Sequence, residues 1–93
     1  MKILGIDPGL RKTGWGLINF NNNFMEHIDD GFISPLVENH DGDRLLCIFH
    51  EIEDILIKYK PSIIGIEKTF VGEGNISSLK LGMARGVCIL VAA

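Results

Sequence analysis

Two acidic residues, each at the end of a short apolar run, are the first candidates for chemistry in this sequence. Asp7 closes the run 2–7, and Glu67 closes the run 62–67. A lone carboxylate in such a place is costly to desolvate. If the two runs are neighbouring parallel strands, both carboxylates emerge at one edge of a sheet, where open α/β sheets bind ligands. They could then hold Mg²⁺ or Mn²⁺, which prefer oxygen ligands, or they could simply form strand-end turns or cap helices.

The segment that follows Asp7 adds glycine and positive charge. Gly5 and Gly9 flank the acid, and glycine allows a phosphate to approach the backbone closely. Arg11 and Lys12 could supply positive charge at the rim of such a site. The alternative is an ordinary glycine-rich hairpin.

The hydrophobic pattern predicts a single α/β domain that would hold these residues. Apolar runs between turn residues predict strands at 2–7, 13–20, 24–34 and 62–67. The first three should form an antiparallel meander, with a bulge at Gly31. A helix between the third and fourth strands would make a right-handed crossover and place strand 62–67 parallel to strand 2–7.

Two helices complete the expected fold. Apolar residues from Leu45 to Tyr59 recur every three or four positions, which indicates an amphipathic helix with Asp41 or Asp43 as its N-cap. A second helix should run from about residue 75 to the end, with Gly82 and Gly86 forming a bare strip suited to close packing. Because no helix stop signal precedes residue 93, we expect a chain whose carboxyl-terminal part is missing.

Composition excludes several classes of protein. The hydrophobic fraction is 46% and the mean hydropathy is +0.24, which argues against disorder and for strands buried on both faces. No run reaches the roughly 18 apolar residues of a membrane helix, and the amino terminus lacks a signal-peptide pattern, so a cytoplasmic protein is expected. Cys47 and Cys88 have no metal or redox spacing and are predicted to be buried free thiols.

The net charge of −3 hides an uneven distribution. Residues 26–54 contain nine acids and one base, a net charge of −8, whereas the rest of the chain contains eight bases and three acids, a net charge of +5. Two of those three acids are Asp7 and Glu67. The segments with the suspected chemistry are therefore basic, which permits phosphate binding on one face, although a solvated acidic helix face explains the acidic half equally well.

Four stretches of the sequence resemble the bacterial Holliday-junction resolvases of the RuvC family, and the likeness extends from the first residue to the last. The stretches are Leu4–Gly9 with Thr13, Gly14 and Gly16; Ile66–Glu67 with Phe70; Ser78–Gly82; and Ala84–Val87. Each is modest by itself, but they occur in order and at suitable spacing.

The resemblance implies a ribonuclease H-like fold and a homodimer that cuts four-way DNA junctions with a divalent metal ion, Mg²⁺ or, in its place, Mn²⁺. Asp7 and Glu67 match the family's catalytic metal ligands, and Phe70 matches a residue that stacks on bases near the junction centre. Lys80 and Arg85 are candidate phosphate contacts, and Gly82 and Gly86 lie on a helix that resembles the family's dimer interface. Branch-migration proteins are further partners that the family implies. Loop packing for Phe70 and a solvated helix face for the two basic residues are the alternatives.

One departure from the family pattern limits the catalytic activity that the resemblance implies for this chain. The family completes its site with two more acidic residues near the carboxyl end, and the only acid after Glu67 here is Glu73. Metal-dependent hydrolysis needs more ligands than two carboxylates. The competing interpretations are an ATP-binding fragment of the actin, sugar-kinase and heat-shock ATPase superfamily, another ribonuclease H-like protein with the same first motif, and a junction-binding remnant without catalysis.

Overall fold

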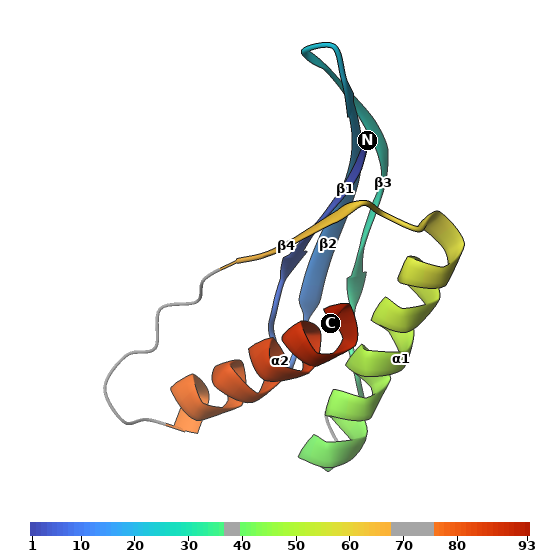
Figure 1. Ribbon diagram of the computed structural model, residues 1–93. Coiled ribbons are helices and arrows are strands. Elements are labelled where there is room, and N and C mark those ends of the chain that lie inside the picture. Colours follow the sequence, from blue (N-terminus) through green and yellow to red (C-terminus); the bar gives the residue numbers. More distant parts are fainter. Residues whose placement is uncertain (37–39, 68–75) are drawn as a thin grey trace.

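The protein is a small α/β domain in which two helices pack beside one mixed sheet (Figure 1). The computed structural model describes residues 1–36, 40–67 and 76–93. In chain order the elements are β1 (Lys2–Asp7), β2 (Thr13–Asn21), β3 (Phe24–Ile33), α1 (Asp41–Tyr59), β4 (Ile63–Ile66) and α2 (Ile76–Ala92). The strand order is β3-β2-β1-β4, with antiparallel pairs except for β4, which is parallel to β1. This arrangement confirms the predicted fold class.

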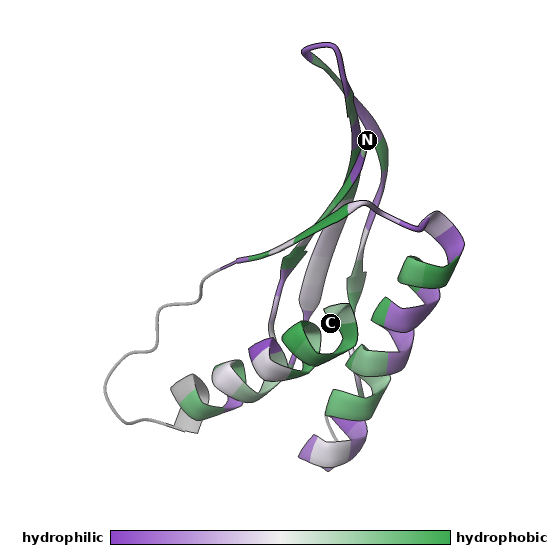
Figure 2. Cartoon of the chain, viewed as in Figure 1, coloured by the Kyte–Doolittle hydropathy of each residue, from purple (hydrophilic) through white to green (hydrophobic). Residues whose placement is uncertain are grey.

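The core lies between the sheet and the two helices. Successive side chains of a strand point to opposite faces, and in β1 the buried residues are Leu4 and Ile6. Leu17 of β2 pairs with Leu4 and is also fully buried. From the helices, Ile48 and Ile52 of α1 and Cys88 of α2 complete this layer. Hydrophilic residues gather on the outer side of α1, as Figure 2 shows.

The opposite face of the sheet is open in this chain. Gly5 and Asp7, which alternate with the buried residues of β1, are exposed, and so is Ile63 of β4. The prediction of strands buried on both faces is therefore wrong for the described residues. The physical reason is that α1 and α2 both contribute to the same core layer, and no other described element lies on the second face.

The irregularity in the β2–β3 hairpin lies at a different place from the predicted bulge. Gly31 does not form a bulge, because it pairs regularly with Trp15, and the register shift lies between Leu17 and Ile18, opposite Ile28. A Cβ atom at Gly31 would approach the Trp15 indole to 3.1 Å. Glycine at position 31 therefore leaves space for the indole, which a larger residue would force to shift.

Helix α1 begins earlier than the predicted cap. His40 occupies the N-cap position without a side-chain cap hydrogen bond, and Asp41 and Asp43 lie within the first turn. There their negative charges interact favourably with the positive end of the helix dipole, and they do not act as the N-cap. The helix ends at Tyr59, and Lys60 is its C-cap: its N–H donates the last helical hydrogen bond to the Leu56 carbonyl, and its left-handed backbone (φ 49°) turns the chain out of the helix.

Helix α2 has a fully buried side and an exposed apolar side. Ala84 and Cys88 are buried, and burial raises the pKa of the Cys88 thiol to about 11, so it is a neutral core residue. Cys47 is a half-buried free thiol, so only Cys88 fully meets the prediction. No helix within the described residues is long and apolar enough to span a membrane.

Candidate functional site

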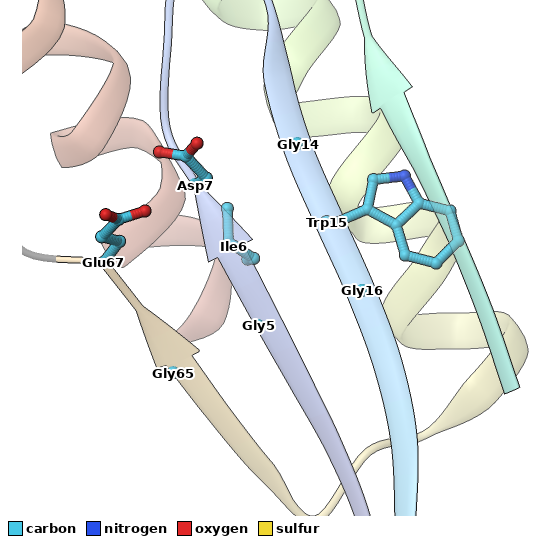
Figure 3. A pocket seen from close by; sticks show the side chains of 8 residues that line it. All are labelled: Gly5, Ile6, Asp7, Gly14, Trp15, Gly16, Gly65 and Glu67. Carbon is cyan, nitrogen blue, oxygen red and sulfur yellow. The ribbon is translucent and has the colours of Figure 1, made fainter. Parts of the chain in front are cut away.

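Asp7 and Glu67 lie together at the carboxyl ends of two adjacent parallel strands (Figure 3). The parallel register pairs Ile6 with Ile66, and the Glu67 N–H donates to the Ile6 carbonyl at 2.9 Å. That bond continues the strand pairing for one more residue and fixes Glu67 beside Asp7. The convergence expected from the sequence is therefore present in the fold.

The two carboxyl groups interact electrostatically. The pKa of Glu67 is raised, first because of a side-chain hydrogen bond with Asp7, then because of repulsion from the Asp7 charge and a small loss of hydration. Two adjacent carboxylates disfavour a second ionisation unless a cation lies between them. The pair is thus suited to share either a proton or a metal ion.

Glycines leave the sheet surface next to the acids without side chains. Gly5 pairs with Gly16 of β2 and with Gly65 of β4, so three neighbouring strands carry no side chain at this level. A cavity of about 400 Å³ lies here, lined by these glycines, by Gly14 and by the two acids among others. A Cβ atom at Gly16 or Gly65 would meet no other atom within 4 Å. The fold itself therefore does not require glycine at these two positions. Access of a ligand to the surface is a remaining reason for glycine there.

An aromatic residue that sequence analysis missed lies in line with the acids. Phe32 of β3 pairs with Gly14, which pairs with Asp7, so all three share one row on the open face. A Cβ atom at Gly14 would lie 3.4 Å from the Phe32 ring. Phe32 is 67% exposed, and the Lys12 ammonium lies 3.9 Å from its ring centre. The contact between Lys12 and Phe32 brings one positive charge toward the edge that carries Asp7 and Glu67. In the sequence, only the alternating pattern of β3 pointed to Phe32.

The loop after Asp7 is fastened by two buried polar side chains. The Thr13 hydroxyl donates to the Gly9 carbonyl at 2.7 Å and accepts from the Gly9 N–H at 3.1 Å. Arg44 of α1 is 5% exposed and donates to the Leu10 carbonyl at 3.2 Å. Sequence analysis missed Arg44 too, although it precedes Ile48 and Ile52 at helical spacing and so belongs to the buried stripe of α1.

A second cavity, of about 280 Å³, lies between this loop and α2. Arg11, Lys12 and Lys80 line it. Three of the predicted nucleic-acid contacts therefore meet at one place. Arg85 does not line this cavity; it is half-buried, and its Nε has no hydrogen-bond partner among the described residues. Phe70 lies outside the described residues.

The donor set fits a divalent cation only in part. Asp7 and Glu67 offer the oxygen ligands that Mg²⁺ and Mn²⁺ prefer. Across residues 1–36, 40–67 and 76–93, no cluster of three or more histidine, cysteine, aspartate or glutamate side chains could hold a metal ion. The pair can therefore provide part of a coordination shell.

Comparisons with known proteins identify the family of this chain. The family model for "Crossover junction endodeoxyribonuclease RuvC" matches residues 3–93. Curated proteins of that name from Gluconacetobacter diazotrophicus and Paramagnetospirillum magneticum are 42% and 43% identical over the whole chain. The chain spans 55% and 56% of their lengths, or about half of each relative.

A solved structure supports the fold independently. The structure of T. thermophilus RuvC in complex with a Holliday junction substrate superposes with a TM-score of 0.89 at 20% identity. The match covers 99% of this chain and 59% of the other. The ATP-binding interpretation is not favoured, because the family model and the curated relatives agree on a nuclease family along the full chain. With its two acids placed at adjacent strand ends, this chain belongs to the RuvC family of crossover junction endodeoxyribonucleases.

Proposed function

We propose that this chain is the amino-terminal part of a structure-specific endonuclease that resolves four-way DNA junctions in recombination and repair by metal-dependent phosphodiester hydrolysis. The observation that carries the proposal is the Asp7–Glu67 pair at the ends of β1 and β4 in a RuvC-family chain. The remaining acidic ligands would come from further chain, since the relatives are nearly twice as long.

Asp7 and Glu67 would hold the cation, with Mg²⁺ as the proposed ion and Mn²⁺ as a substitute. When bound, a divalent cation neutralises charge that develops on the phosphate and its leaving oxygen. The two residues supply the oxygen ligands, and a cation between them would offset the repulsion from Asp7 that contributes to the raised pKa of Glu67. The glycine surface beside them leaves room for a sugar-phosphate backbone to approach the acids.

Contacts to the DNA are proposed for the basic residues near this edge. Arg11, Lys12 and Lys80 would bind backbone phosphates, which attract cationic side chains irrespective of sequence. We retain Arg85 as a weaker candidate and Phe70 as a proposed stacking residue on the strength of the family resemblance alone. Branch-migration proteins remain partners proposed on the same ground. A cytoplasmic location is a separate proposal, in keeping with a chain whose substrate would be DNA.

A homodimer is proposed through the exposed side of α2. Leu79 and Leu90 are each 66% exposed, and Ile89 is also exposed. Gly82 and Gly86 lie between them at helical spacing, and a Cβ atom on either would meet nothing within 4 Å. An apolar helix side with a bare backbone strip suits the close approach of a second copy. A two-fold dimer would present two sites to the two-fold symmetric junction, so paired incisions would follow from the symmetry.

The test uses a chimera in which residues 1–93 are followed by the carboxyl-terminal part of the G. diazotrophicus relative. With Mg²⁺ or Mn²⁺ and a synthetic four-way junction, the chimera should make symmetric nicks, and the same chimera with Asp7→Asn should not. Linear duplex of equal length is the control for structure specificity. Absence of metal-dependent nicking in a folded, junction-binding chimera would leave a binding protein without catalysis, and absence of binding as well would refute the proposal.

A further inference from the structure

The cavity between the loop 8–12 and α2 has a charge environment unlike that of the acidic edge. It is lined by Gly9, Leu10, Arg11, Lys12, Lys80 and Leu81, so every ionisable lining residue is basic. The nearest carboxylate with a described contact is Asp41, which lies 3.9 Å from the Lys80 ammonium and 3.7 Å from the Arg44 guanidinium. Three basic residues therefore line one cavity, and among the described residues Asp41 lies at its border through its contact with Lys80.

The cavity has the size and the chemistry for a hydrated phosphate. Its volume of about 280 Å³ is several times the roughly 30 Å³ that one water molecule occupies in the liquid. Arginine binds phosphate oxygens through its planar fork, and lysine binds them as a point charge. A phosphate would replace Asp41 as the partner of Lys80, and that exchange costs little because the existing contact is long and solvated.

The loop that forms one wall is held in place before any ligand binds. Thr13 ties down Gly9 through two hydrogen bonds, and Arg44 ties down Leu10 from within the core. A Cβ atom at Gly9 would lie 2.4 Å from the Lys12 carbonyl oxygen, so the turn is too tight for any other residue. A fixed loop spares the ordering cost that flexible loops impose on binding.

The cavity is also connected to the acidic edge through the chain. The loop 8–12 starts immediately after Asp7, and Lys12 both lines the cavity and lies over Phe32, which shares a row with Asp7. A sugar-phosphate strand that crosses the loop would meet the cations on one side and the two acids on the other.

We infer that this cavity binds one backbone phosphate of the DNA strand that is cleaved at Asp7 and Glu67, a phosphate other than the one that is cut. The inference rests on the proposed function for the identity of the strand. Arg11, Lys12 and Lys80 bind the phosphate jointly, and Arg44 acts as a positioning residue that holds the loop without touching the DNA.

Salt dependence of binding tests whether the three cations share one phosphate. The 93-residue chain and its variants are titrated into a labelled four-way junction between 50 and 200 mM KCl, with EDTA present to prevent cleavage. Each phosphate contact contributes about 0.9 to the slope of log K against log salt. For each copy of the chain bound to the junction, with the number of copies taken from the binding stoichiometry, the triple variant Arg11→Gln/Lys12→Gln/Lys80→Gln should lose about 0.9 in total, whereas cations on three separate phosphates would lose about 2.7.

Lys60→Gln is the matched control, because Lys60 is an exposed lysine at the far end of α1 and should leave the slope unchanged. All four positions are exposed or half-exposed, and circular dichroism confirms that each variant is folded. A triple variant with an unchanged slope, or with a loss near 2.7, overturns the inference.

Inorganic phosphate provides a readout that does not depend on the junction. In a chloride-matched NMR titration, phosphate should shift the amide signals of Gly9 to Lys12 and of Lys80 and Leu81, and the triple variant should abolish those shifts. Phosphate shifts without junction binding would refute the proposed function and leave the anion site standing. Junction binding and cleavage with neither shifts nor a slope change would refute the inference alone.

Discussion

The two faces of the sheet carry opposite kinds of residue, although they alternate along the same strands. In β1, Leu4 and Ile6 point into the helix-covered core, whereas Gly5 and Asp7 point to the open face. The covered face is filled with large apolar side chains, as expected where burial supplies the stability. The open face carries glycines at its centre and two acids at one edge. Stability and function are therefore separated by strand alternation within a few residues of each other.

The largest effect should follow from damage to the covered face. Leu17 is fully buried between the sheet and the helices, so Leu17→Ala should lower the free energy of unfolding by about 2–5 kcal/mol through lost burial and a residual cavity. Phe32→Ala, on the open face, is the matched change of an apolar residue and should cost about 1 kcal/mol or less. Urea denaturation measures both. Equal losses would mean that the two faces do not differ as described.

Asp7→Asn should reduce activity and leave stability intact, the reverse of the effect expected for Leu17→Ala. In the chimera that carries a complete chain, it should lower the rate of junction nicking by about 100-fold or more, as expected when a group that stabilises transition-state charge is lost. The melting temperature in the absence of metal should stay the same or rise, because a neutral amide at this position would relieve the repulsion that raises the pKa of Glu67. Full nicking activity in this variant would remove Asp7 from the site.

Side chains added to the glycine surface should separate stability from function most clearly. Gly16→Ala and Gly65→Ala meet no atom in the fold and should raise the free energy of unfolding by about 0.4–1 kcal/mol, because the unfolded chain loses freedom. Nicking should fall by about 10- to 100-fold, since the DNA backbone would be displaced from the acids. Gly42→Ala, an open position in α1, is the control. Unchanged nicking would show that the substrate does not use this surface.

Metal binding should tighten as pH rises. Glu67 has a raised pKa, so the metal-free protein keeps a proton on the pair above the ordinary range of a glutamic acid, and the cation must displace it. Isothermal titration calorimetry with Mn²⁺ at several pH values should show increasing affinity with proton release until the raised pKa is passed. In the absence of metal, the same shift makes stability fall as pH rises through that window, because the folded state holds more protons than the unfolded state. Affinity independent of pH would contradict the shared proton.

The smallest effect is expected at Asp29, on the covered side of β3. Tyr59 of α1 donates a hydrogen bond to Asp29, and this bond is the main reason why the pKa of Asp29 is lowered. The contribution is present above the ordinary pKa of an aspartic acid and disappears as pH falls through the lowered value. Tyr59→Phe should therefore lower the melting temperature slightly at neutral pH and have less effect in acid. A larger effect in acid would reverse the sign and reject this account.

Much of the fold followed from local pattern. The strand end at Asp7 and the amphipathic stripe of α1 are local features, and the structure has them where the pattern predicted; β4 ends at Ile66, one residue before Glu67. The bulge was misplaced at Gly31 because a glycine that makes space for Trp15 has the same local signature as a glycine in a bulge. Distinguishing the two requires the partner strand.

The sequence by itself determined that Asp7 and Glu67 end apolar runs, that the surrounding segments are basic, and that the motifs resemble one nuclease family. Only the tertiary structure decided which face of the sheet is covered, because alternation defines two faces without saying where the helices pack. It also decided that Arg11, Lys12 and Lys80 meet in one cavity and that Arg44 fastens the loop from within the core. These contacts join residues more than 30 positions apart, and such distances depend on the packing of the sheet against the helices.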